Sequence, residues 1–227
     1  YLVMGTNAKC PPFEMRGGAS GADVVGFDVE IAKAIAAKAG LPLKIEDMEF
    51  ERLLPALAEG KVDLVLAALP ITEERRQQVD FSVPYYKATQ MALILAGGLV
   101  PESKEELRGL RIGAQAGSTG FAEAEQLTST ENLRSITSPH GGAVDLMNSQ
   151  LDVVILDEQP AVYLAERTPE LMLLHPEFDE EVFGVAVRKG NTNLLETVNQ
   201  VLGEMVADGR YDRLVDEWLV HTTEARE

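Results

Sequence analysis

The chain has 227 residues, and 45% of them are hydrophobic, so it is long enough for one large or two modest domains with true cores. Its 37 acidic and 20 basic residues give a formal net charge of −17, which repels phosphate backbones and anionic lipid surfaces. We therefore expect neither a nucleic-acid nor a membrane-surface partner. Cys10 is the only cysteine, which excludes an intrachain disulfide and a cysteine-cluster metal site. With no apolar run long enough to cross a bilayer and no leader before Tyr1, the sequence suits either a cytoplasmic protein or a mature or trimmed chain.

Short β-rich runs alternate with helical stretches, a pattern typical of α/β layers. The first half of the chain predicts strands at Leu2–Gly5, Leu43–Ile45 and Val62–Ala67. It predicts helices at Phe27–Ala39 and Phe50–Glu59, which end at glycines.

A long extended segment, Tyr85–Leu95, precedes a Gly- and Pro-rich stretch, so we expect the chain to leave a first lobe there. Ser103 with Glu106 predicts the capping box of a short helix. Phe183–Arg188 predicts the return crossing. The predicted domains are therefore residues 1–95 as the first part of lobe 1, 96–184 as lobe 2, and 185–227 as the return to lobe 1.

The second lobe is predicted to begin with a strand at Arg111–Gln115 and to contain a helix near Ala143–Met147, a strand at Val153–Leu156 and a helix after Pro160. Two amphipathic helices, roughly Asn193–Ala207 and Tyr211–Val220, end the chain and are expected to pack on the first lobe.

The segments 60–68 and 149–157 resemble each other: a helix end, an apolar-Asp pair, then a buried strand. Ligands of open α/β sheets bind beyond the carboxyl ends of strands, so two such strands would provide two facing strand ends. Chance similarity between short βαβ units is the alternative.

Polar features follow these strand ends. Arg75 lies one turn into a short predicted helix, where a guanidinium can hold a carboxylate with two hydrogen bonds, although Arg75 or Arg76 pairing with a surface glutamate is the commoner arrangement. The loop Gln115–Gly120 follows a strand and opens a helix, whose N–H groups suit an anion. Asp157 ends the second strand and can neutralise an ammonium group, cap the next helix, or do both. Together these groups describe a receptor for a zwitterion.

Catalytic and metal-binding interpretations find less support. His140, His175 and His221 are far apart and lack metal-ligand spacing, and the loop after Gln115 has no P-loop lysine. No nucleophile elbow occurs. We expect no enzyme activity, no cofactor and no metal.

Several motifs together resemble family 3 of the bacterial extracellular solute-binding proteins: Gly5-Thr6-Asn7-Ala8 with Pro12-Phe13-Glu14, Gly26 to Ala32, Ile71 to Arg75, Val79 to Ser82 with Pro84-Tyr85-Tyr86, Gly184 to Gly190, and Asp208 to Asp212 before Trp218. The resemblance covers nearly the whole chain. It implies a two-lobed α/β periplasmic-binding-protein fold of type II with two crossing strands as the hinge. It also implies an extracytoplasmic, monomeric receptor, in the periplasm or at the cell surface, that closes on a free amino acid and delivers it to the membrane subunits of an ABC importer.

The same resemblance implies site residues. Arg75 would bind the α-carboxylate with the backbone at Thr119, and Asp157 would bind the α-ammonium with the Ala68 carbonyl. Phe50 would form an aromatic wall. The variable part of the pocket would be lined by Asn7, Cys10, Gln115 and Ser118.

Three positions depart from the family pattern. Pro70 stands where a Thr or Ser usually supplies a hydroxyl and an N–H to the carboxylate, so two hydrogen bonds are lost. Asn7 and Cys10 replace an aspartate and an aromatic residue typical of members with cationic ligands, which favours a neutral or polar side chain. Two alternatives stay open: the sensor domain of a membrane histidine kinase or cyclase, and a dehydratase of cyclic amino-acid precursors.

Overall fold

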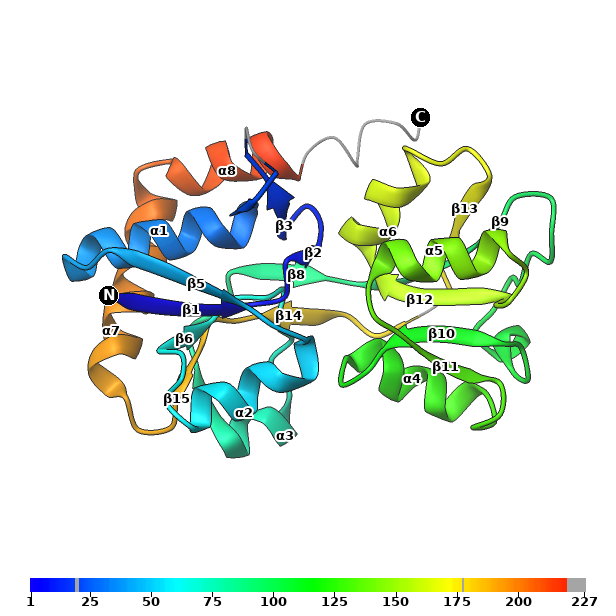
Figure 1. The fold of residues 1–227 in the computed structure, drawn as a ribbon, viewed down its shortest axis with the longest axis horizontal. Helices are drawn as coiled ribbons and strands as arrows, with labels where there is room; N and C mark the ends of the chain where they lie inside the picture. The colour runs from blue at the N-terminus through cyan, green and yellow to red at the C-terminus, as the bar shows by residue number, and fades with distance from the viewer. Residues whose placement is uncertain (19–20, 177, 220–227) are drawn as a thin grey trace. The chain divides into compact units, whose positions relative to one another are not determined.

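The computed structural model describes residues 1–18, 21–176 and 178–219. The chain forms two compact units. Unit 1 comprises Tyr1–Lys87 and the chain from Glu181 onward, and unit 2 comprises Ala88–Glu180. Each unit contains one five-stranded sheet with helices packed against it (Figure 1). This confirms the predicted two-lobed α/β architecture.

The strands described in unit 1 are β1 (Leu2–Thr6), β2 (Lys9–Cys10), β3 (Glu14–Gly17), β4 (Asp23–Val25), β5 (Leu43–Asp47), β6 (Leu64–Val65), β7 (Val79–Phe81), β8 (Tyr86–Ala88, whose last residue begins unit 2), β14 (Glu181–Phe183) and β15 (Ala186–Arg188). Its helices are α1 (Phe27–Ala39), the 3-10 turn η1 (Phe50–Arg52), α2 (Leu53–Ala58), α3 (Glu73–Gln78), α7 (Thr192–Ala207) and α8 (Arg210–Trp218). Unit 2 contains β9 (Gln90–Leu95), η2 (Glu105–Leu107), β10 (Ile112–Gln115), α4 (Thr119–Leu127), β11 (Leu133–Ile136), α5 (Pro139–Met147), β12 (Val153–Asp157), α6 (Glu158–Ala165) and β13 (Leu171–Leu174).

The two main sheets have the same topology. Their orders are β5-β1-β6-β15-β7 and β11-β10-β12-β9-β13. In each sheet three strands are parallel, and the fourth runs antiparallel to both of its neighbours. That fourth strand is β15 or β9, the one that follows the chain's passage from the other unit. The crossing segments β8 and β14 pair with each other.

Backbone requirements at its two ends fix helix α1. Gly26 has φ 138°, and a Cβ on it would lie 2.2 Å from the carbonyl oxygen of Phe13, so only glycine fits. The N–H groups of Phe27 and Asp28 donate to the Pro12 and Phe13 carbonyls, which satisfies two of the unpaired groups at the helix start. Gly40 ends the helix in the left-handed conformation.

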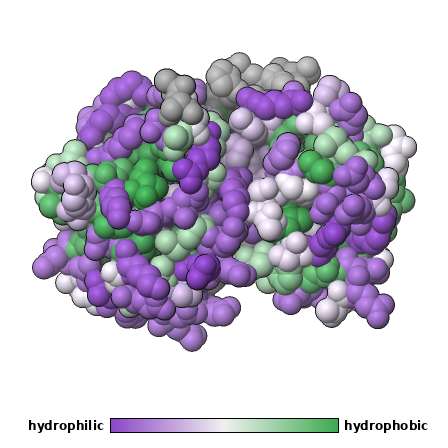
Figure 2. Space-filling model, viewed as in Figure 1, coloured by the Kyte–Doolittle hydropathy of each residue, from purple (hydrophilic) through white to green (hydrophobic). Residues whose placement is uncertain are grey.

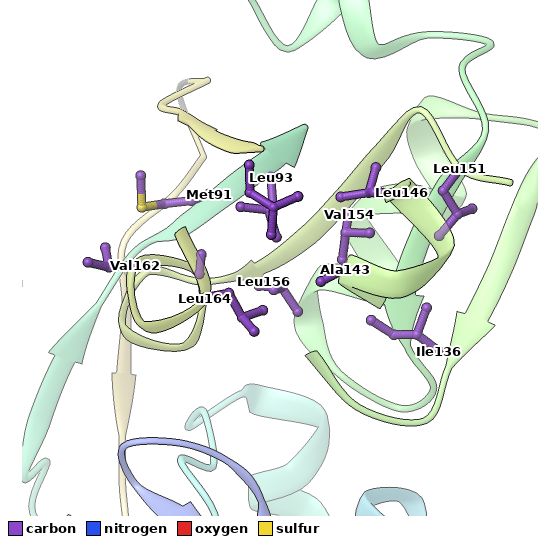
Figure 3. Close-up of a cluster of buried hydrophobic side chains, with 12 residues drawn as sticks. Met91, Leu93, Ile136, Ala143, Leu146, Leu151, Val154, Leu156, Val162 and Leu164 are labelled. Carbon is purple, nitrogen blue, oxygen red and sulfur yellow. The ribbon is translucent and has the colours of Figure 1, made fainter. Parts of the chain in front are cut away.

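Both units have a core of buried aliphatic side chains, and unit 1 adds a cluster of aromatic ones. Unit 1 has an aromatic cluster, in which the Phe13 ring lies 5.2–6.1 Å from three other rings, those of Phe27, Tyr86 and Phe183. Such edge-to-face contacts add to the stabilisation gained by burial. In unit 2 the aliphatic core lies between the sheet and helices α5 and α6 (Figure 3). A second aliphatic cluster, which includes Ala124 and Leu127, lies under α4 on the other face of the sheet.

Several predicted elements are shorter in the structure. Val62–Ala67 gives only the two-residue strand β6, because the backbone turns into a left-handed conformation at Ala68, φ 44°. Phe50–Glu59 begins as a 3-10 turn before α2. The last predicted helix is α8, and its expected end at Val220 lies outside the described residues.

The predicted capping box at Ser103 was wrong. The cap position of η2 is Lys104, and the Glu106 carboxylate accepts from the Glu102 N–H rather than from Ser103. Ser103 instead contributes its backbone carbonyl, which accepts from the Glu106 N–H. The turn is too short for the reciprocal bonds of a capping box.

The unit boundaries lie earlier in the chain than the expected crossings at 95/96 and 184/185. Strand β9 pairs with β12 and β13 along its length, so the chain has entered unit 2 by Ala88. Both β14 and β15 belong to unit 1. The long extended segment predicted at Tyr85–Leu95 is two strands, β8 and β9, separated at Thr89.

Hydrophilic residues cover much of the face shown in Figure 2, as expected for a net charge of −17. In the part of the chain that the structure describes, no helix combines the length and apolarity needed to cross a membrane.

Candidate functional site

Arg75, the arginine that the sequence predicts to bind a carboxylate, is buried, with 8% of its surface exposed. Thr72 caps α3 by accepting from the Arg75 N–H at 3.2 Å, which fixes the first turn of this short helix. The guanidinium Nη1 donates to the Pro70 carbonyl at 2.7 Å, and its carbon lies 5.6 Å from the centre of the Phe50 ring. The structure therefore brings Arg75, Pro70 and Phe50 together within unit 1.

Ala68 lies in the connection between β6 and α3 with φ 44°. This left-handed conformation is unfavourable for any residue that has a side chain. Its N–H donates to Asp28 Oδ2 at 2.7 Å, and the Tyr85 hydroxyl donates to the same oxygen at 2.9 Å. The Asp28 carboxylate thus stabilises the strained backbone at Ala68.

Asp28 is one of two fully buried carboxyl groups that form a hydrogen-bonded pair, the other being Glu14 on β3. Two carboxyl groups in contact need one shared proton. Burial raises the pKa of Asp28 to about 6, although the bonds from Ala68, Tyr85 and Glu14 favour its ionised form. Burial also raises the pKa of Tyr85 well above its usual value, and the nearby carboxylates add to that effect.

The remaining unit 1 candidates lie on or after the first strands. Asn7 is buried and donates from Nδ2 to the Met48 carbonyl at 2.8 Å. Cys10 is half-buried, and its carbonyl accepts from the Phe13 N–H. Lys9 forms an ion pair with Glu49, next to Phe50 in the chain.

In unit 2, the predicted glycine loop forms a tight turn into α4. The Ser118 N–H donates to the Gln115 carbonyl at 3.1 Å, and Gly117 has φ 75°. The Ser118 hydroxyl caps the helix by accepting from the Phe121 N–H, so it is occupied by the helix itself. As the first residues of α4, Thr119 and Gly120 have N–H groups without partners inside the helix, which suits a negatively charged group.

Asp157 is the last residue of β12 and occupies the cap position of α6. In the described chain its side chain makes no capping hydrogen bond to that helix, so the capping alternative is not observed. Asp157 is paired with Gln90 across the antiparallel β12–β9 ladder. Gln90 in turn donates from Nε2 to the Thr119 hydroxyl at 2.7 Å. Unit 2 thus brings Asp157, Gln90 and Thr119 together.

Sequence reasoning assigned no role to four of these residues: Glu14, Asp28, Tyr85 and Gln90. Asp28 resembles an ordinary acidic residue in a first helical turn, and Gln90 begins an apolar strand. The available signal was a polar residue at a position where the apolar pattern predicts burial, because such a residue needs a partner inside the protein.

Among the described residues, no group of three or more His, Cys, Asp or Glu side chains could hold a metal ion. His221 lies outside the described residues. The charged groups that the structure places near strand ends are a buried guanidinium in unit 1 and, in unit 2, a carboxylate close to the start of a helix.

Two α/β units of equal strand order, joined by two crossings, define the type II periplasmic-binding-protein fold, the fold of solute-binding receptors. Residues 2–221 match the model of the bacterial extracellular solute-binding proteins, family 3, and the chain belongs to that family.

Similar proteins share this architecture over nearly their full length. The chain is 32% identical to the arginine-binding extracellular protein ArtP of Bacillus subtilis, over 96% of this chain and 85% of ArtP. It superposes on an ancestral arginine-binding protein bound to glutamine with a TM-score of 0.90 and 36% identity, covering 96% of this chain and 97% of the other. The substrate-binding protein of an amino-acid ABC transporter gives a TM-score of 0.90 and 34% identity, covering 96% and 98%.

Proposed function

We propose that this protein is an extracytoplasmic receptor that binds a free amino acid and delivers it to the membrane subunits of an ABC importer, without chemical change. The observation that carries the proposal is Arg75, a buried guanidinium that contacts the Pro70 carbonyl and the Phe50 ring. A guanidinium fixed in this way is suited to bidentate contact with a carboxylate. The names of the similar proteins, which refer to amino acids, support the same ligand class.

The two units would each supply part of the recognition. Arg75 would bind the α-carboxylate, with help from the N–H groups at Thr119. Asp157 would bind the α-ammonium, and the Ala68 carbonyl would assist. A ligand that contacts both units favours the closed state, because only that state offers both sets of contacts.

The side-chain pocket would be lined by Phe50, Asn7, Cys10, Gln115, Ser118 and Pro70. Because Asn7 and Cys10 supply no negative charge, we favour a neutral or polar side chain, such as that of glutamine. Arginine is the competing ligand, since ArtP is named for it. The ancestral relative is called arginine-binding and yet holds glutamine, so one scaffold of this kind accommodates both.

The sensor and dehydratase alternatives are not favoured, because similar proteins are named as binding proteins of ABC transporters. We further propose that the receptor is a monomer in the periplasm or at the cell surface. The extracellular family supports that location.

The test is a thermal-shift screen of the purified protein against the twenty L-amino acids. A ligand present at 100 times its Kd stabilises the folded state by about 2.7 kcal/mol, which raises Tm measurably. We expect a shift with one or a few amino acids, with glutamine and arginine as the leading candidates. Unchanged ligand after long incubation, measured by mass spectrometry, is expected of a receptor and not of a dehydratase. A flat screen would refute the proposal.

A further inference from the structure

Gln90 is a polar residue in an otherwise apolar strand, and only 5% of its surface is exposed. Burying an amide is costly unless each of its polar atoms finds a partner. Here Nε2 donates to the Thr119 hydroxyl oxygen at 2.7 Å, whereas Oε1 is shielded from solvent and has no hydrogen-bond partner among the described residues. Of the two ends of this buried amide, Nε2 has a partner, Thr119, and Oε1 has none among the described residues.

The surroundings are built to allow that contact. Gly120 follows Thr119 in α4, and a Cβ at Gly120 would lie 3.4 Å from Gln90 Nε2 and 3.2 Å from the Ile155 side chain. An alanine there would touch the amide at about van der Waals distance and the Ile155 side chain more closely than usual, so the glycine leaves room for both. Gln90 is also directly opposite Asp157 in the ladder, and side chains directly opposite each other lie on the same face of the sheet.

The hydrogen bond has a chemical consequence for Thr119. A hydroxyl group has one proton to donate and two lone pairs to accept with. When one lone pair accepts from Gln90, the hydroxyl proton is directed away from Gln90, and Thr119 becomes a donor toward its other side. A donor next to the N–H groups of the α4 start is what a carboxylate requires.

We propose that Gln90 is a positioning residue for ligand recognition, which orients the Thr119 hydroxyl as a donor to the α-carboxylate of the bound amino acid. This inference rests on the proposed function and adds to it a residue that does not itself touch the ligand. Gln90 acts through Thr119, on the unit that also carries Asp157.

The experiment compares Gln90→Met with the wild-type protein by calorimetry, using the tightest ligand among the twenty L-amino acids and the α-carboxamide of that same amino acid. The carboxamide lacks the carboxylate that Thr119 would bind. We expect Gln90→Met to weaken binding of the amino acid about tenfold and of its carboxamide less than about twofold, since hydrogen bonds to charged groups are the strong ones. Equal losses for both ligands, or none, would overturn the inference.

A double-mutant cycle with Thr119→Val provides a second measurement. Once the hydroxyl is absent, Gln90→Met should weaken amino-acid binding by less than about a further twofold, because its effect on affinity depends on that hydroxyl. Full additivity would contradict the mechanism. Thr128→Val is the matched control: it removes a hydroxyl at the other end of α4, where Thr128 donates to the Leu110 carbonyl, and should leave the ratio of amino acid to carboxamide affinity unchanged.

Stability separates this role from a structural one. Because the buried Oε1 has no hydrogen-bond partner in the part of the chain that the structure describes, Gln90→Met should leave Tm of the unliganded protein unchanged or higher. A merely structural glutamine would lower Tm and weaken both ligands together. If the wild-type protein binds none of the twenty amino acids, the proposed function fails and this inference fails with it. If the wild type binds one and Gln90→Met has the same ratio of amino acid to carboxamide affinity as the wild type, only this inference fails.

Discussion

The two units of the protein share a strand order but differ in the side chains they place on it. Both units have aliphatic cores, but unit 1 adds an aromatic cluster, a buried guanidinium and a buried carboxyl pair, while unit 2 has a helix start next to a carboxylate. The equal topology follows from similar runs of apolar residues, such as those that form β6 and β12 at the centre of each sheet. Backbone pattern thus determines the scaffold, and the polar residues at strand ends determine what each unit can bind.

The largest effects should come from the two cores. Phe13→Ala removes a fully buried ring and should lower the free energy of unfolding by about 3–5 kcal/mol, and Leu93→Ala in unit 2 by about 2–5 kcal/mol. Denaturant titration measures both values. In hydrogen exchange, Phe13→Ala should reduce protection mainly in β1 and β6, and Leu93→Ala mainly in β10 and β12. Loss spread equally over both units in either variant would show that the units do not behave as separate cores; the exposed Val206→Ala serves as a control with little effect.

The buried carboxyl pair should give unit 1 a pH dependence. Folding raises the pKa of Asp28 from 3.8 to about 6, so the folded state binds the proton more tightly than the unfolded state. This contribution to stability is fully present below pH 3.8 and is lost as the pH rises through about 6, a change on the order of 3 kcal/mol. The groups facing Asp28 are the Ala68 N–H, Tyr85, Glu14 and Tyr211.

The variant Asp28→Asn tests this assignment. An asparagine oxygen can accept from Ala68 and Tyr85 without a charge, so the variant should lose the pH slope between about pH 4 and 7 and be more stable than the wild type above pH 6. Asp80 provides a contrast of opposite sign, because the Gly190 N–H and Lys189 lower its pKa, and its contribution is lost as the pH falls. Urea unfolding at a series of pH values measures both, and an unchanged slope in Asp28→Asn would disprove the role of Asp28.

Ligand affinity should depend on one charged residue in each unit. Arg75→Met and Asp157→Asn should each weaken amino-acid binding at least about tenfold, since each removes a charged hydrogen-bonding partner worth about 1.5–3 kcal/mol. Arg76→Met is the matched control, because the neighbouring Arg76 is exposed and contacts Glu73. Calorimetry gives the affinities. Wild-type affinity for the amino acid in both Arg75→Met and Asp157→Asn would disprove the zwitterion model.

The smallest effects should come from helix caps. Thr72→Ala in unit 1 and Ser138→Ala in unit 2 each remove a side-chain acceptor from a helix start and should cost about 1 kcal/mol of stability. The two should differ in ligand binding, because Thr72 holds the N–H of Arg75 whereas Ser138 holds that of Gly141. We expect a two- to threefold loss of affinity in Thr72→Ala alone. Equal affinities would mean that the cap does not position the guanidinium.

Local features of the fold were predictable. Helix α1 has the predicted bounds, Phe27–Ala39, because its apolar spacing and the glycines on either side act within a few residues. Long-range features were not. The contact of Glu14 with Asp28 depends on the closeness of β3 to the start of α1, and the contact of Gln90 with Thr119 depends on the order of strands in the second sheet.

By itself, the sequence determined the α/β class, the two lobes, the positions of most helices and strands, and the family, because each of these depends on residue patterns that are local or ordered along the chain. Only the tertiary structure decided which polar side chains meet. The partner of a buried polar group lies far away in sequence, so local patterns do not identify it. Burial selects the partner, because a polar group without a hydrogen bond is more unfavourable in the protein interior than in water.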